Sequence, residues 1–300
     1  MIINKTNIFV KDNNIALPVN IEKYLLSVLS PSSPGTEYWE SPPPAKISDN
    51  QFGRILLQVH QILDIYESMN IDLNNKSFLD VGTGNGMIPR LMLFLTNLSK
   101  SIGVDPFLDG EHATSWQKHD HDETLNGIKA FIEKHCNSYL DYKDYSQFTG
   151  RENFVFKPQP IKISTSPNLD YIFHQTDIHE LHTLDEKFDL IYCKAIEHIS
   201  NWESAFSSVS SVANKGAIFY LKHRSFYSYL GPHRYATTGI PWGHLLLTEH
   251  EYKRYTSEFH PSRHNEINDF MFNGLAYPCL LYTSDAADDL LCVDLGGRRI

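Results

Sequence analysis

Residues 78–86 have the sequence Phe-Leu-Asp-Val-Gly-Thr-Gly-Asn-Gly. A short apolar run leads into three alternating glycines, and a mostly apolar stretch, 87–98, follows them. This pattern predicts a buried strand, a tight turn and a buried helix. Glycine lets a backbone turn tightly and approach a ligand closely, because it carries no side chain. The stretch therefore predicts an α/β fold with a nucleotide-like ligand at its first turn.

Strand and helix patterns alternate along the rest of the chain. Strands are predicted at 101–105, 169–175, 188–193 and 216–222, and helices at 52–69, 122–136 and 201–214. Alternation of this kind predicts a mostly parallel sheet with helices on both faces, which is a three-layer Rossmann-like architecture. The helix at 122–136 belongs to an insertion, about 106–167, that is much longer than an ordinary connection.

The ends of the chain differ from its middle. Residues 31–50 are rich in proline and serine, so segment 1–51 is predicted to be an N-terminal arm and residues 52–278 the domain.

Thr248 and Glu251 have the spacing of a capping box, which predicts a helix that begins there and continues to Phe259.

Composition limits the classes of partner. The chain has 26 basic and 36 acidic residues, a formal net charge of −10, and no basic stripe, so nucleic acid is not an expected partner. No apolar run approaches the ~20 residues that a membrane span needs, and the first ten residues lack the apolar core of a signal peptide. The sequence therefore predicts a cytoplasmic protein without a membrane partner.

The spacing of the glycines favours one class of cofactor. Gly82, Gly84 and Gly86 form a G-x-G-x-G pattern, whereas a dinucleotide site needs its third glycine where this chain has Met87. This difference favours S-adenosylmethionine over a nicotinamide. Asp105 ends the next predicted strand, where a carboxylate can accept hydrogen bonds from both ribose hydroxyls, although NAD enzymes also have an acid there.

Five segments of the chain resemble the class I, Rossmann-like, S-adenosylmethionine-dependent methyltransferases. They are 79–86, 103–105, 175–178, 188–191 and 197–199. The resemblance implies that Asp177 and the backbone of Ile178 border the adenine, and that Asp80 and Gly82 hold the amino acid end. The cofactor-binding set that it implies is Asp80, Gly82, Thr83, Gly84, Asn85, Gly86, Asp105, Asp177, Ile178 and Lys194.

The same family normally ends with an antiparallel strand pair. Only residues 260–278 remain between the predicted last helix and a segment, 279–300, that resembles translated sequencing-adapter read-through. We therefore expect the C-terminal strand pair to be truncated and residues 279–300 to be a non-native tail.

Three histidines are candidates for a catalytic base: His223, His233 and His198. Methyl transfer from a sulfonium is an in-line displacement, so a base is needed only for a hydroxyl or charged amine acceptor. The pair Glu197 and His198 is similar to ubiquinone-pathway O-methyltransferases, some of which bind a divalent cation with acids of this segment. Lys194 replaces one of those acids and would repel a cation, so no metal is predicted.

Residues 223–247 contain aromatics, histidines and glycines without strand or helix period, which is typical of a lid or substrate-binding loop. The predicted substrate-binding residues are Arg234, Tyr235, Trp242 and His244. The predicted function is methyl transfer from S-adenosylmethionine to a small-molecule or sugar-like acceptor, on oxygen. The alternatives are a non-catalytic S-adenosylmethionine-binding protein and an NAD-dependent oxidoreductase.

Overall fold

The structure is a computed structural model, and it describes part of the chain. The described residues are 7–19, 49–84, 86–106, 126–127, 130, 139–140, 161–162, 171–194, 196, 199, 201–222, 227, 238–261, 264–272 and 291–292. Most of the insertion predicted at 106–167 therefore lies outside them. Its described part includes a two-residue antiparallel pair, β5 (Tyr139–Leu140) with β6 (Ile161–Lys162).

Six strands of the described residues form the main sheet. They are β3 (Ser77–Val81), β4 (Lys100–Asp105), β7 (Tyr171–Gln175), β8 (Phe188–Cys193), β9 (Ala213–Leu221) and β10 (Leu291–Cys292). The spatial order is β10-β9-β8-β3-β4-β7, and every neighbouring pair is parallel, which confirms the predicted α/β architecture. The order reverses direction at β3, between β4 and β8. Ligands of open parallel sheets bind at such a point, beyond the carboxyl ends of the strands.

The outer edge of the sheet beside β9 is where the family normally has the antiparallel pair that we expect to be truncated in this chain. Among the described residues, the strand there is β10, which lies within segment 279–300 and pairs parallel to β9, with Leu291 opposite Ile218. The predicted non-native origin of that segment stays a prediction.

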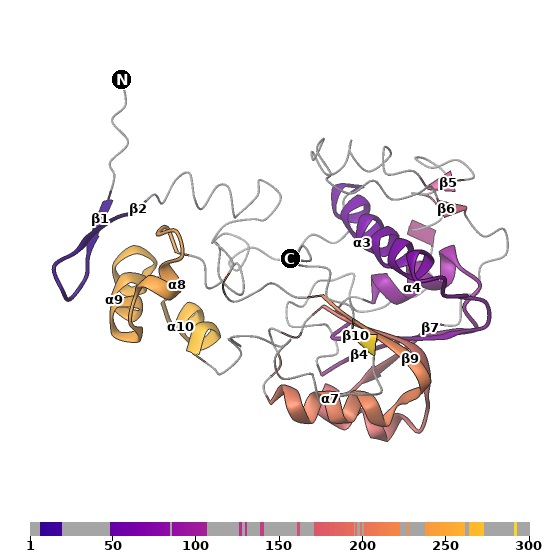
Figure 1. The fold of residues 1–300 in the computed structure, drawn as a ribbon. Coiled ribbons are helices and arrows are strands. Elements are labelled where there is room, and N and C mark those ends of the chain that lie inside the picture. Colours follow the sequence, from indigo (N-terminus) through magenta and orange to yellow (C-terminus); the bar gives the residue numbers. More distant parts are fainter. Residues whose placement is uncertain are drawn as a thin grey trace.

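The two faces of the sheet are covered by different helices, as period-two alternation on the strands requires. Phe78 packs with α3 (Asp49–Ser68) and α4 (Met87–Leu95) on one face. Leu79 packs on the other face in a cluster with η2 (Ile178–Leu184) and α7 (Trp202–Ser211). Figure 1 shows α3 and α4 on one side of the strands and α7 on the opposite side. These layers leave the carboxyl edge of the sheet for a ligand.

A hairpin and three helices form a separate hydrophobic cluster. The hairpin is β1 (Asn7–Val10) with β2 (Ala16–Val19), and the helices are α8 (Gly243–Leu246), α9 (Glu249–Phe259) and α10 (His264–Phe272). Phe9 inserts among them and meets Tyr255 edge to face, with ring centroids 5.7 Å apart. The sequence predicts only an arm for residues 7–19, which form the hairpin. Segments far apart in the chain thus share one core (Figure 1).

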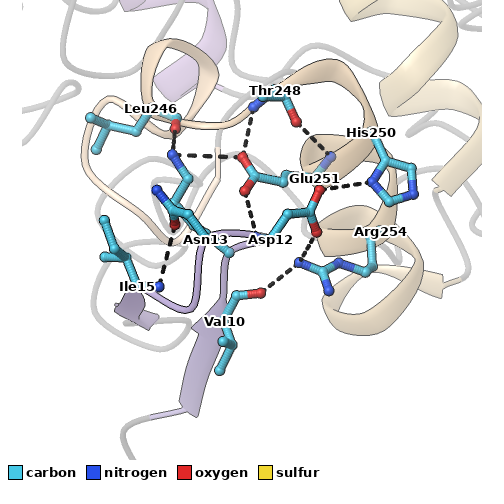
Figure 2. A network of polar contacts seen from close by, with 10 residues as sticks. Val10, Asp12, Asn13, Ile15, Leu246, Thr248, His250, Glu251 and Arg254 are labelled. Atoms are coloured by element: carbon cyan, nitrogen blue, oxygen red, sulfur yellow. Dashed lines mark hydrogen bonds and ion pairs between the residues drawn. The ribbon is translucent and has the colours of Figure 1, made fainter.

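Glu251 connects the hairpin turn to helix α9 (Figure 2). Its buried carboxylate accepts hydrogen bonds from the backbone amides of Asp12, at 2.8 Å, and Thr248, at 2.9 Å. The Thr248 hydroxyl in turn accepts from the Glu251 amide at 3.2 Å, so the predicted capping box is confirmed. Arg254 adds an ion pair with Asp12 at 3.1 Å. The hairpin is therefore held to the helix by polar as well as apolar contacts.

Replacing Glu251 is expected to destabilise this cluster. Glu251→Ala leaves two part-buried amide donors without their acceptor, so the free energy of unfolding should fall by about 1–3 kcal/mol in urea titrations. Burial acts to raise the pKa of Glu251, but hydrogen bonds to Thr248 and Asp12 and the charge of Lys11 together lower it. The stabilisation should therefore be full above the unfolded pKa of 4.5 and disappear as pH falls through the lower folded value.

The matched control is Glu249→Ala on the same helix. The Glu249 side chain is 60 % exposed and pairs with Lys253 at 2.5 Å, so its loss should cost less than about 0.5 kcal/mol. Equal losses for the two variants would show that the Glu251 contacts do not hold the hairpin.

Candidate functional site

The turn after β3 has a backbone that glycine favours. The φ angles are +70° at Gly82, +56° at Gly84 and +65° at Gly86, all in the left-handed region. L-residues adopt this region at a cost, whereas glycine enters it freely. The three glycines are therefore explained by the path of the backbone itself.

The first part of the turn is tied to the neighbouring strand β4. The amides of Gly82 and Thr83 both donate to the Val104 carbonyl, each at 2.9 Å. The amide of Gly84 donates to Oδ2 of Asp105, also at 2.9 Å. A Cβ built at Gly84 would meet no heavy atom within 4 Å, so this side of the turn is open. The predicted ribose-binding carboxylate thus lies directly beside the open side of the predicted loop.

Asp80 is a buried carboxyl group under the same turn. It is 2 % exposed, and its Oδ2 accepts a hydrogen bond from the Thr83 hydroxyl at 2.7 Å. The pKa of Asp80 is raised to about 7, mainly by burial. The charge of Asp105 also raises this pKa, whereas the Thr83 hydrogen bond and the charge of Lys194 lower it. The group therefore carries a proton in part of the molecules near neutral pH, and a bound cation would favour its charged form.

Asp177 follows β7 at the same edge of the sheet. Its Oδ1 accepts from the His179 amide at 2.9 Å and lies 2.5 Å from Nδ1 of the same histidine. Its side chain is 44 % exposed. Ile178 is buried and packs with Leu79 and its neighbours. The Asp177 carboxylate and the Ile178 backbone therefore lie at the edge of the sheet, while the Ile178 side chain packs in the core.

The structure brings several predicted cofactor residues to one edge. Asp80, the glycine turn and Asp105 are in contact, and Asp177 and Lys194 follow strands that end at the same edge. Lys194 is exposed and acts on Asp80 electrostatically. Asn85, His198, His223, His233, Arg234 and Tyr235 lie outside the described residues.

Two predicted substrate-binding residues are described, and both lie at α8. Trp242 precedes that helix and is 45 % exposed, whereas His244 lies within it and is buried. Ile240 and Leu247, on either side of helix α8, belong to the hydrophobic cluster formed with the hairpin, and Figure 1 shows α8 beside α9. Their role in binding an acceptor stays a prediction.

Arg90 and Tyr171 were not predicted, although both lie against the glycine turn. A Cβ added at Gly86 would lie 2.3 Å from the Tyr171 hydroxyl and 3.0 Å from the Arg90 guanidinium. One signal was present in the sequence, because Arg90 is the only charged residue in the nine-residue helix Met87–Leu95. A lone charge in a buried helix indicates a specific polar or aromatic partner.

The described residues contain neither a cluster of metal-binding side chains nor a membrane-spanning helix. No group of three or more His, Cys, Asp or Glu side chains in these ranges could hold a metal ion. Among the described helices, none combines the length and hydrophobicity that crossing a bilayer requires.

Comparison with solved structures finds remote similarities to proteins of this architecture. The YcgJ protein from Bacillus subtilis is 18 % identical, with a TM-score of 0.31, and the match covers 56 % of this chain and 51 % of that one. A S-adenosylmethionine-dependent methyltransferase from Clostridium acetobutylicum is 16 % identical, with a TM-score of 0.30, over 62 % and 54 % of the two chains. The matched region thus spans about half the length of these proteins.

Magnesium protoporphyrin IX methyltransferase from Synechocystis, solved with S-adenosylmethionine, is 14 % identical, with a TM-score of 0.31, over 65 % of this chain and 73 % of that one. No curated protein sequence matches the chain.

A family model decides the class. The model described as a methyltransferase domain matches residues 54–264, which is most of the chain. The chain therefore belongs to the methyltransferase domain family. Together with the parallel sheet, this match confirms the predicted methyltransferase family and α/β fold.

The buried carboxyl group gives a testable pH dependence in the ligand-free protein. Between the unfolded pKa of 3.8 and the folded value of about 7, the unfolded chain ionises Asp80 while the folded chain retains the proton. Stability should therefore decrease as pH rises through this range. Asp80→Asn cannot ionise, so its free energy of unfolding relative to wild type should improve by on the order of 2 kcal/mol between about pH 5 and about pH 8.

Asp189→Asn is a control whose effect should not depend on pH in this range. Burial acts to raise the pKa of Asp189, but hydrogen bonds from Ser77 and Asn214 and the charge of Lys76 together lower it below 3.8. Asp189 is therefore ionised in both the folded and the unfolded chain between about pH 5 and about pH 8, so the stability difference between this variant and wild type should stay constant. A pH-independent difference between Asp80→Asn and wild type would contradict the buried, protonated carboxyl.

Proposed function

We propose that this enzyme transfers the methyl group of S-adenosylmethionine to a small-molecule or sugar-like acceptor, on oxygen. The observation that supports the donor site most strongly is the open side of Gly84 beside Asp105. A side chain there would occupy space that nothing in the described protein fills, and the adjacent carboxylate can accept hydrogen bonds from a ribose. An adenosine ligand therefore fits the residues that are present.

The other donor contacts follow from the order of the strands. Asp177 and the backbone of Ile178 would border the adenine, because β7 lies beyond β4 on that side of the turn. Asp80, Gly82, Thr83 and Gly86 would hold the amino acid end. The buried Asp80 carboxyl supplies a negative charge for an ammonium group, and Lys194 and Asn85 complete the proposed set.

The acceptor would be held by the segment 223–247. In this proposal Arg234, Tyr235, Trp242 and His244 contact the acceptor, and His223, His233 or His198 removes its proton. Bound S-adenosylmethionine supplies an electrophilic methyl group. The protein aligns the acceptor oxygen with that group and excludes water, and positioning of this kind can supply ~7–11 kcal/mol of the barrier reduction. The net charge of −10 favours a small acceptor over nucleic acid.

A thermal-shift comparison tests the donor. S-adenosylmethionine and S-adenosylhomocysteine should raise the melting temperature, whereas NAD should not. Gly84→Val should abolish the shift, because the side chain enters the open space and the φ of +56° strains it. Asp105→Ala should weaken it. Stabilisation by NAD would instead support the oxidoreductase alternative.

Gly216→Val is the matched control for the glycine substitution. Gly216 has a φ of +76° and nothing within 4 Å of its Cβ position, and it lies in β9. The same backbone strain should therefore lower the melting temperature of both variants, and only Gly84→Val should lose the response to ligand. Stabilisation by S-adenosylmethionine without turnover of any acceptor would favour the non-catalytic alternative.

Proton release tests the proposed position of the amino acid end. An ammonium group beside Asp80 would lower the pKa of this carboxyl from its ligand-free value of about 7. Binding of S-adenosylhomocysteine slightly below that pH should therefore release a fraction of a proton. Calorimetry in buffers with different ionisation enthalpies measures this fraction, and Asp80→Asn should show none. A binding heat that does not depend on the buffer would place the ammonium elsewhere.

A further inference from the structure

Helix α4 places a guanidinium group in the core, behind the glycine turn. Arg90 is 3 % exposed, and all but one of the other residues of this helix are buried apolar side chains or proline. A buried cation is costly unless other groups stabilise it. The Cζ atom of Arg90 lies 4.2 Å from the centroid of the Tyr171 ring, a cation–π arrangement. Strand β7 therefore supplies a partner for a charge on α4.

The Tyr171 hydroxyl lies close to the positions of two glycines, Gly86 in the turn and Gly103 in β4. Cβ atoms added at Gly86 and Gly103 would lie 2.3 Å and 2.8 Å from this oxygen. The Gly103 position is also 2.8 Å from the Thr83 hydroxyl. Burial raises the pKa of Tyr171, and the charge of Arg90 acts in the opposite direction. The phenol thus fills the space between two glycines and Thr83.

The three glycines of the turn therefore serve different purposes. Gly84 faces open space, whereas Gly86 faces the Tyr171 hydroxyl and the Arg90 guanidinium. The Gly86 carbonyl also accepts from the Arg90 backbone amide, at 3.4 Å. Two side chains from α4 and β7 hence pack against the backbone of the turn at the position where it enters the helix.

We propose that Arg90 and Tyr171 form a brace that fixes the glycine turn in its ligand-binding conformation. Both are positioning residues, because they lie against the turn and not on its open side. Glycine loses more conformational freedom on ordering than any other residue, so ordering an unsupported turn would make the free energy of ligand binding less favourable. With the brace, the turn is already ordered when the protein folds, and ligand binding does not include this entropy loss. This proposal rests on the proposed function, since the ligand is the methyl donor.

The brace predicts an effect on affinity that exceeds its effect on stability. Tyr171→Phe retains the ring over Arg90 and removes the hydroxyl that lies against Gly86, so the affinity for S-adenosylhomocysteine should fall about three- to tenfold. Arg90→Lys retains the charge but loses the planar stacking on the Tyr171 ring, so its affinity for S-adenosylhomocysteine should fall by a similar factor. Titration calorimetry gives these dissociation constants. Tyr252→Phe, a buried tyrosine of α9, is the control and should bind as wild type does.

Hydrogen exchange separates positioning from general destabilisation. In the ligand-free variants the amides of Gly84 and Gly86 should exchange faster than in wild type, while those of β8 remain as protected as before. A uniform increase across β8 and the turn, or an unchanged affinity in a folded Tyr171→Phe variant, would overturn the brace. If wild type itself fails to bind S-adenosylhomocysteine, the proposed function fails instead.

A double-mutant cycle tests the contact directly. Gly86→Ala should lower the melting temperature, because its methyl group meets the Tyr171 hydroxyl at 2.3 Å and φ is +65°. The same substitution in the Tyr171→Phe background should cost less, since the closest atom is gone. Additive effects of the two substitutions would show that the hydroxyl does not press on the turn and would contradict the brace.

Discussion

The hydrogen bond from the Gly84 amide to Asp105 is the contact on which the rest of the site depends. It joins the turn after β3, whose glycines have positive φ angles, to the end of β4. Because the order of the sheet reverses at β3, the carboxyl end of this strand is where open parallel sheets bind their ligands. The result is a backbone turn with one open side and a carboxylate beside it.

Two ionisable side chains are buried around that turn, and burial of such groups lowers the stability of the fold unless partners stabilise them. Asp80 and Arg90 are both almost fully buried, and each would be expensive without the partners that the structure provides. Thr83 connects the two regions, because its hydroxyl bonds to Asp80 and lies close to Tyr171. A cationic ligand group near Asp80 would stabilise the ionised form of this carboxyl and so offset part of the destabilisation caused by its burial.

The sequence predicted what depends on local pattern. The strands at 78–81, 101–105 and 188–193, the glycine turn and the capping box at Thr248 depend on neighbouring residues, and all of them are present. The sequence did not predict the hairpin on α9 or the contact between Arg90 and Tyr171. Both join segments that are distant in the chain, so no periodicity encodes them, and only packing brings the partners together.

A crystal structure with S-adenosylhomocysteine would show whether the turn with Asp105 is the donor site. The ribose hydroxyls should lie within hydrogen-bonding distance of the Asp105 carboxylate, and the amino acid end should lie over the open side of Gly84 towards Asp80. Density for the ligand at another place on the molecule, with the turn empty, would contradict it.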